Sequence, residues 1–446
     1  MILADFATVL ENWVDDRYEV QVSHNALGDT CVYARYKDWV CSKDHRLKEL
    51  LREETIMSEI SQQDCGHRGQ WCGVRHLHED FDDLILPRFQ AEFDLRDVDL
   101  FACGHPLYWC RLVATFDAPI LGVWDMTHHL FVPEELQHEW TGQFLELFQR
   151  KGNLLVALSA YHGFQLEWLL GLRVPYFQLT VPDVSLVARY SPHVRPNEVF
   201  VSRFNTLYDV DLLYRFAEAA SLPFRFVDWN ALSCGKDCSK AQLARFRASV
   251  LCAYDTSNMK LTEFYAMAVP IFIFGGGLWR TTMRWAQADA KAGGPNATLG
   301  GRDFRDPPEP YGRQGPKDGR WISQGMQQAT EEILWERPWQ ESLRGNAPPY
   351  GRLPYSPFME SRNELIPPAA AFWAQLTDWA LLPHIQRYES VPHLLHMLSE
   401  LSLEDLLEIS RRMASHYAQL LVASTNFWRA VIVSLVEDRD ASKWKG

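Results

Sequence analysis

Two carboxylates and a lysine stand around the predicted start of one helix in the middle of the chain. Asp255 closes the apolar run SVLCAYD, Lys260 lies in the first turn of a helix predicted from about Met259 to Met267, and Glu263 follows eight residues after Asp255. A cation in a first helical turn is unfavourable unless an anion lies nearby, because the helix dipole is positive there. Unpaired N–H groups at a helix start bind phosphate, and carboxylates accept hydrogen bonds from sugar hydroxyls. The pattern therefore predicts a site that combines phosphate with sugar hydroxyls.

Polar side chains also follow apolar runs in the first half of the chain. His105 follows VDLFACG, Asp125 follows APILGVW, and His162 follows LVALSAY. Ligands of parallel α/β sheets bind at the carboxyl ends of the strands, so these positions predict groups that face a ligand. A histidine or an aspartate there can serve as a general base. For His162 we favour a helix-capping role over catalysis.

A cluster of cysteines and histidines near the N-terminus has the residue types of a zinc site. Its members are Cys65, His67, Cys72, His76 and His78. Thiolate and imidazole are the preferred zinc ligands, and four of them would complete a tetrahedron. The spacing fits no standard zinc finger, however. We therefore interpret the segment as a polar loop and predict no metal, while a metal-containing interaction protein stays open as an alternative.

The elements that must position these residues form two successive α/β series. Strand-like runs cover 98–104, 118–124, 153–161 and 174–181, then 198–204, 223–229, 249–255 and 271–274. Helical patterns lie between them, one beginning at Asp209 with Leu212, Leu213, Phe216, Ala217 and Ala220 on one face. Strands that alternate with helices predict βαβ units and parallel sheets. Beyond residue 369 the pattern is helical.

These runs predict an α/β protein with two Rossmann-like domains facing each other across a cleft. We place the first domain at 1–190, the second at 197–370, and a tail of helices that packs back across both at 371–446. The Pro-rich segment 191–198 is the predicted linker. A Gly/Pro-rich stretch at about 288–320 is a predicted flexible insertion in the second domain.

The segment 255–273, DTSNMKLTEFYAMAVPIFI, resembles the donor-binding segment of GT-B glycosyltransferases. Retaining members carry an acidic residue, seven others, and then Glu-Ala-x-Ala-x-Gly-x-Pro. Asp255, Glu263 and Pro270 match the two acidic positions and the proline, whereas Ala268 replaces the glycine. The segment 201–219, VSRFNTLYDVDLLYRFAEA, resembles the family's first donor-domain strand and helix, with Arg203 at the diphosphate-binding arginine. Tyr208 stands where the family has a lysine.

The resemblance implies a glycosyltransferase whose second domain binds a nucleotide-diphosphate sugar and whose first binds an acceptor, which is a carbohydrate, a protein or a small molecule. It implies that Arg203 and Lys260 neutralise the diphosphate, Glu263 holds the ribose, and Asp255 holds the donor sugar, with a weak preference for retention. Together with the strand-end positions, the expected catalytic residues are Asp255, Arg203, Lys260, His105 and Asp125. The expected donor-binding residues are Arg203, Ser257, Asn258, Lys260, Glu263, Gly275 and Gly276. The family generally works without a bound metal or other cofactor. A catalytically inactive GT-B-like binding or scaffold protein is the alternative, because of Tyr208 and Ala268.

Composition limits the remaining functional classes of protein. The chain has 446 residues and a net charge of -13, which argues against a general nucleic-acid binder because such proteins neutralise phosphates with Lys and Arg. No apolar run reaches the ~18 residues of a membrane span, so we expect none. The start has no basic n-region, which favours the cytoplasm, or the Golgi lumen if the chain is trimmed. Nine scattered cysteines are not the dense pattern of a disulfide scaffold.

Overall fold

The computed structural model describes part of the chain as two compact units. The described residues are 81–104, 107–125, 137–170, 172–202, 207–228, 232, 239–251, 259–275 and 373–443. Among them, unit 1 comprises the residues up to Leu158, Val174–Leu179 and those from Ala423 on. Unit 2 comprises Ser159–Arg173 and the residues between Thr180 and Val422. The units therefore alternate along the chain, whereas the predicted domains follow one another. The predicted insertion at 288–320 and the Cys/His cluster at 65–78 lie outside the described residues.

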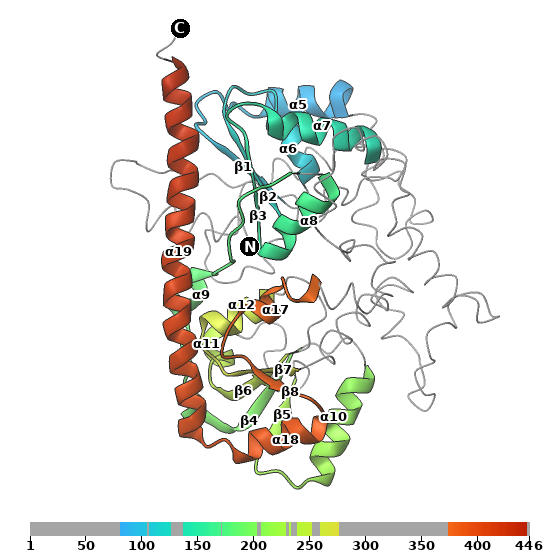
Figure 1. Ribbon diagram of the computed structural model, residues 1–446, viewed down its shortest axis with the longest axis vertical. Coiled ribbons are helices and arrows are strands. Elements are labelled where there is room, and N and C mark those ends of the chain that lie inside the picture. Colours follow the sequence, from blue (N-terminus) through green and yellow to red (C-terminus); the bar gives the residue numbers. More distant parts are fainter. Residues whose placement is uncertain are drawn as a thin grey trace, which may run out of the picture. The chain divides into compact units, whose positions relative to one another are not determined.

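Unit 1 holds a parallel sheet of three described strands in the order β1-β2-β3. The strands are β1 (Phe101–Gly104), β2 (Ile120–Trp124) and β3 (Leu154–Ala157). Its other elements are η1 (Phe81–Ile85), α5 (Leu86–Glu92), η2 (Leu107–Trp109), α6 (Cys110–Val113) and α7 (Gln137–Gln149). In Figure 1, α5, α6 and α7 lie beside these strands. All of β2 is buried, and Trp124 packs on Phe144 of α7 with their ring centroids 5.9 Å apart.

Unit 2 holds a second parallel sheet, of five described strands in the order β5-β4-β6-β7-β8. The strands are β4 (Arg195–Val201), β5 (Arg225–Val227), β6 (Phe246–Val250), β7 (Ile271–Phe274) and β8 (Gln386–Tyr388). The chain starts at β4, moves outward to β5, and then returns past β4 to β6. The order therefore reverses between β4 and β6. The prediction of an α/β protein with parallel sheets is confirmed.

Helices lie on both faces of the unit 2 sheet (Figure 1). The helical elements of unit 2 are α8 (Ala160–Leu170), α9 (Pro182–Val187), the 3-10 turn η4 (Pro192–Val194), α10 (Leu207–Ala219), α11 (Lys240–Leu243), α12 (Met259–Ala266), α17 (Asp378–Leu381), α18 (Val391–Glu400) and the first part of α19 (Leu403–Lys443). Val199 and Val201 of β4 join one core with Leu213 of α10. Phe200 between them stacks on Phe264 of α12, with ring centroids 5.4 Å apart. This alternation is what a strand buried on both faces requires.

Four predicted elements differ from the structure. The run 174–181 is not a strand, since it makes only one isolated bridge, from Tyr176 to β3. The helical tail was predicted without β8, a three-residue strand that is fixed by its pairing with β7 rather than by its own pattern. On α10, Leu213 lies on the buried face whereas Phe216 is 42% exposed. Finally, β6 ends at Val250, so Asp255 follows five residues after the strand instead of closing it.

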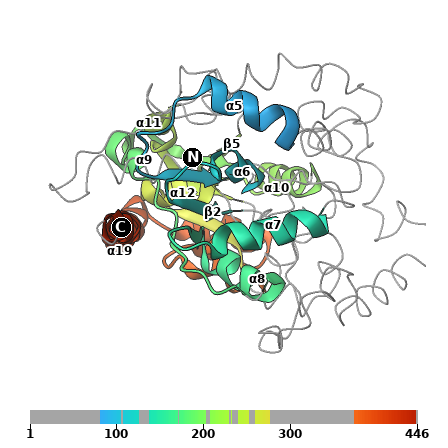
Figure 2. The same cartoon turned by 90° about the horizontal axis from the view of Figure 1, so that it is seen from above.

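The long helix α19 bears on the expectation that the chain has no membrane span. Its stretch Leu403–Leu435 is long and apolar enough to cross a membrane by length and composition alone. A helix that packs on a protein core passes the same test. Leu406 and Met413 are buried within unit 2, and Trp428 is buried within unit 1 against Phe177. Figure 2 shows the helix nearly end-on.

Candidate functional site

The reversal of strand order in unit 2 lies between the two strands that precede the predicted donor-binding segments. The chain leaves β4 at Val201, shortly before Arg203, and leaves β6 at Val250, before Asp255. Open parallel α/β sheets bind ligands outside the carboxyl ends of the strands at such a reversal. The predicted residues Arg203, Asp255, Ser257, Asn258, Gly276 and His105 themselves lie outside the described residues. Lys260, Glu263, Gly275 and Asp125 are described.

Three charged side chains meet where the chain after β6 enters α12. The Lys240 ammonium donates a hydrogen bond to Oε2 of Glu263, and Nζ of Lys260 lies 2.8 Å from the same oxygen. The exposed fraction of the side chain is 1% for Glu263, 5% for Lys240 and 34% for Lys260. We call these residues the Lys–Glu–Lys cluster. Its two described members from the predicted site, Lys260 and Glu263, are thus in contact with each other.

Two helix starts position the cluster. Lys240 is the first residue of α11, which is capped by Ser239: its Oγ accepts a hydrogen bond from the Gln242 backbone, and the Gln242 side chain accepts one from the Ser239 backbone. Lys260 is the second residue of α12, and Glu263 follows one turn later on the same face. Sequence reasoning missed Lys240. The only signal was the Ser-x-x-Gln capping pattern, which marks a helix start but not a partner 23 residues away.

The electrostatics of the cluster follow from two ammonium groups that share one buried carboxylate. Burial by itself raises the pKa of Glu263, but attraction by Lys240 and Lys260 outweighs it, so that the pKa lies below its usual range. Burial lowers the pKa of Lys240 to about 7; Glu263 opposes this shift, and the neighbouring Lys260 adds to it. Burial, which penalises the charged form, is the largest cause of the shift at Lys240. The more buried lysine is therefore the one whose proton is weakly held.

Gly275 follows β7 and has a packing requirement that the sequence did not reveal. A Cβ atom at this position would lie 2.8 Å from Cβ of Arg387 and 2.8 Å from Oε1 of Glu389. Its backbone N–H also donates to the carbonyl of Tyr388, at 2.6 Å. The backbone of Gly275, an expected donor-binding residue, thus lies close to the end of β8. The neighbouring Gly276 lies outside the described residues.

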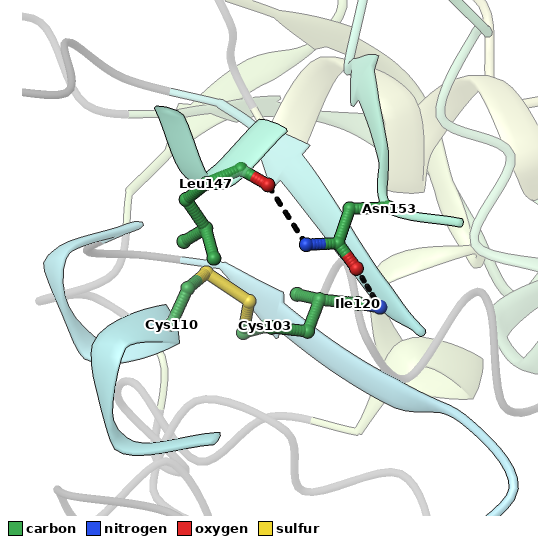
Figure 3. Close-up of a disulfide and its surroundings, with 5 residues drawn as sticks. All are labelled: Cys103, Cys110, Ile120, Leu147 and Asn153. Atoms are coloured by element: carbon green, nitrogen blue, oxygen red, sulfur yellow. Dashed lines mark hydrogen bonds between the residues drawn. A yellow bond between two sulfur atoms is a disulfide. The ribbon is translucent and has the colours of Figure 1, made fainter. Parts of the chain in front are cut away.

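In unit 1 the carboxyl ends of β1 and β2 carry the acceptor-side candidates. Asp125 directly follows β2 and is half-buried. A disulfide joins Cys103 in β1 to Cys110 in α6, with their Cα atoms 5.6 Å apart (Figure 3). It closes a short loop that contains position 105. The sequence did not indicate this pair, because two cysteines with six residues between them match no standard cysteine motif.

Figure 3 also shows Asn153, whose side chain links β2 to α7. Asn153 accepts a hydrogen bond from the backbone of Ile120 at 2.9 Å and donates one to the carbonyl of Leu147 at 2.8 Å. The amide thereby fixes the start of β2 to the end of α7.

Among the described residues, no group of three or more His, Cys, Asp or Glu side chains has the geometry of a metal site.

His162 belongs to unit 2 and lies in the first turn of α8. Oγ of Ser159 lies 2.8 Å from Nδ1 of His162 and accepts a hydrogen bond from the His162 backbone at 3.4 Å. Both side chains are buried. Ser159 therefore caps the start of α8 through the His162 backbone, and the imidazole contacts the capping hydroxyl.

A cavity of about 430 Å³ lies at the amino ends of β4 and β5 in the unit 2 sheet. Arg195 and Arg225 line it, and both contact Glu198, at 3.1 Å and 2.5 Å respectively. Arg195 also lies over the ring of Phe246, 4.8 Å from its centroid. Because all five strands are parallel, this cavity is at the amino ends, away from the residues predicted to bind a donor.

Comparison with known proteins gives no further assignment. No family model, no curated protein and no solved structure matches the chain.

Proposed function

We propose that the protein is a glycosyltransferase that uses a nucleotide-diphosphate sugar as donor and needs no resident metal. The observation that supports this best is the reversal of strand order between β4 and β6. Arg203 follows the first of these strands, and Asp255 and Lys260 follow the second. A diphosphate bound at this edge would meet cations from two neighbouring loops, and the sugar would meet a carboxylate from one of them.

In the proposed reaction the bond between the sugar C1 and the diphosphate oxygen breaks, and an acceptor hydroxyl oxygen bonds to C1. Arg203 and Lys260 stabilise the negative charge that develops on the leaving diphosphate. Asp255, Ser257 and Asn258 hold the donor. His105 or Asp125 takes the proton of the acceptor hydroxyl. The proposal includes the GT-B arrangement, in which the first α/β domain supplies the acceptor side.

The role proposed for Glu263 differs from the one that the resemblance implies. A carboxylate that is 1% exposed and contacts two ammonium groups is poorly placed to accept hydrogen bonds from ribose hydroxyls as well. We therefore assign Glu263 a positioning role, in which it holds the ammonium of Lys260 at the start of α12.

The test is binding, followed by turnover. UDP, GDP, UDP-glucose and GDP-mannose are screened by thermal shift and calorimetry, because a ligand at 100 times its Kd stabilises the folded state by about 2.7 kcal/mol. Arg203→Gln and Lys260→Gln should each abolish the shift, whereas Lys151→Gln, at an exposed turn of unit 1, should retain it. A folded protein that binds none of the four compounds would refute the proposal.

A catalytically inactive nucleotide-binding or scaffold protein is the second candidate. It is favoured by the engagement of Glu263 with two lysines, together with Tyr208 in place of the family's lysine and Ala268 in place of its glycine. Release of sugar or of nucleotide diphosphate separates the two. Binding without any hydrolysis or transfer, over a panel of acceptors, would select the scaffold.

A further inference from the structure

We propose that the carboxylate of Glu389 accepts hydrogen bonds from ring hydroxyls of the donor, either those of its ribose or those of its transferred sugar. This inference rests on the proposed function, and it adds a residue that the resemblance does not include. It also supplies a carboxylate for sugar hydroxyls, a role for which the buried Glu263 is poorly placed.

Glu389 lies at the edge of the unit 2 sheet where we propose that the donor binds. It directly follows β8, which pairs with β7. Because all five strands are parallel, Glu389 and Gly275, which follows β7, leave the sheet at the same edge as the carboxyl ends of β4 and β6. Sheets of this kind bind their ligands outside that edge.

The strand order determines how far Glu389 is from the proposed diphosphate. In the sheet, β8 is the second strand beyond β6. Neighbouring strands lie about 4.8 Å apart, so the carboxyl ends of β6 and β8 are separated by roughly 10 Å. A nucleotide-diphosphate sugar carries one ring on each side of its diphosphate. With the diphosphate at the ends of β4 and β6, a ring that is directed along the edge toward β8 brings its hydroxyls to the side chain of Glu389.

The carboxylate of Glu389 is turned toward the end of β7. Its Oε1 lies 2.8 Å from the point that a Cβ atom at position 275 would occupy, so the absence of a side chain at Gly275 makes room for it. Glu389 is exposed, and within the part of the chain that the structure describes no hydrogen bond or ion pair engages its carboxylate. Both oxygens can therefore accept hydrogen bonds from a ligand.

The turn that carries Glu389 is fixed by the start of α18. The backbone N–H of Glu389 donates a hydrogen bond to Nδ1 of His393 at 3.2 Å. The backbone N–H of His393 in turn donates to Oγ of Ser390, the N-cap of α18, at 3.2 Å. These bonds hold the backbone on both sides of the turn and do not use the carboxylate.

The residues that directly follow the other strands of unit 2 offer no comparable group. Ser202 follows β4, Leu251 follows β6, and Asp228 follows β5. The carboxylate of Asp228 hydrogen-bonds the hydroxyl of Tyr214 in α10. Among the described residues at these five strand ends, Glu389 therefore carries the one exposed carboxylate.

The experiment is calorimetric titration of the full chain with UDP-glucose, UDP and 2′,3′-dideoxy-UDP, and with GDP-mannose, GDP and 2′,3′-dideoxy-GDP. Glu389→Ala removes the carboxylate, and Glu389→Gln keeps its shape without its charge. Glu400→Ala is the matched control, because Glu400 is an exposed carboxylate at the other end of α18, 4.0 Å from His396. The variants are compared in the series that wild type binds.

We expect wild type and Glu400→Ala to bind the nucleotide sugar alike, and Glu389→Ala to bind it about tenfold or more weakly, which is the loss typical of a hydrogen bond to a charged group. Glu389→Gln should lose less, because its amide oxygen still accepts. A loss for the nucleotide sugar alone assigns the hydroxyls to the transferred sugar. A loss that extends to the nucleotide diphosphate but not to its dideoxy form assigns them to the ribose.

If Glu389→Ala fails to fold, Glu389→Gln still tests the inference through the same ligands. Unchanged affinity of the folded Glu389 variants would overturn the inference while leaving the proposed function intact. An equal loss for all three ligands of a series would do the same, because the dideoxy form lacks the ribose hydroxyls and the sugar. No binding of any of the six compounds by folded wild type would overturn the proposed function as well.

Discussion

Replacing the buried carboxylate of the Lys–Glu–Lys cluster tests whether its charge is part of the fold. In Glu263→Gln the amide retains an oxygen that can accept hydrogen bonds, but two ammonium groups lose their counter-ion. Removing one partner of a buried ion pair costs about 3–5 kcal/mol. Since the amide keeps hydrogen-bonding capacity and Lys260 is partly exposed, we expect the lower limit, about 3 kcal/mol at pH 7. The same substitution at an ordinary exposed carboxylate would cost far less.

The loss should depend on pH in a defined direction. Above pH 8, Lys240 is largely neutral in wild type, so the substitution removes only the pairing with Lys260. As pH falls below 7, Lys240 becomes protonated and is stabilised by Glu263 only in wild type. The penalty of Glu263→Gln should therefore grow as pH falls, by up to about 1.4 kcal/mol per unit.

The assay is urea unfolding followed by circular dichroism at pH 6, 7 and 8. The control is Glu408→Gln on α19, because Glu408 also contacts two cations, Arg411 and Arg412, at 2.8 Å each, but on the surface. Exposed ion pairs contribute little, so this variant should unfold almost as wild type does. The double variant Glu263→Gln/Lys240→Met should be more stable than Glu263→Gln, since it removes one of the uncompensated ammonium groups. Equal behaviour of Glu263→Gln and Glu408→Gln, or a penalty that does not change with pH, would refute the reasoning.

Three further predictions concern other described features. Because the pKa of Lys240 is lowered in the folded state, its contribution to the unfolding free energy should increase from pH 7 toward pH 10, and this slope should be absent from Lys240→Met in urea titrations. Gly275→Ala should destabilise unit 2 by about 1–3 kcal/mol through its clash with the end of β8, whereas Gly142→Ala, where a Cβ meets nothing within 4 Å, should be neutral or stabilising in thermal unfolding. Cys103→Ser should lower the unfolding free energy by about 2.5 kcal/mol, the loop-closure entropy of the eight residues that the disulfide spans, and peptide mapping without reduction should find the 103–110 link in wild type.

The sequence predicted those elements whose signals are local. The helix at Met259 and the strand at Ile271 were found because an amphipathic run is followed by Pro270 and then by four apolar residues. The strand β8 was missed because its three residues, Gln386–Tyr388, owe their conformation to pairing with β7, more than a hundred positions earlier. The exposed position of Phe216 was missed for a related reason. A helical pattern identifies an apolar stripe, but the neighbouring elements decide which part of the stripe is covered.

The candidate site was likewise predicted from the sequence only where its signals are local. Spacing along one helix correctly brought Lys260 and Glu263 together, since positions three apart share a face. It did not indicate Lys240, which comes from another helix, or that the carboxylate is buried. Those two facts change the expected effect of substituting Glu263. From the sequence we expect a loss of donor binding with stability almost unchanged, and from the structure we expect a large loss of stability.

A stability effect at Glu263 does not by itself argue against a functional site. Lysines need a counter-ion to stay charged when they are partly removed from water, and a site that binds phosphate has no such anion until its ligand arrives. A carboxylate fixed beside the lysines fills that need in the free protein. Its burial limits how far it competes with a solvent-exposed phosphate for the ammonium of Lys260. The same burial disfavours the charged form of Lys240 and lowers its pKa. The structural role of Glu263 and the proposed binding role of Lys260 are therefore compatible with one arrangement. Loss of stability should accompany loss of phosphate binding in Glu263→Gln, whereas Lys260→Gln, which leaves Glu263 paired with Lys240, should lose binding with little loss of stability.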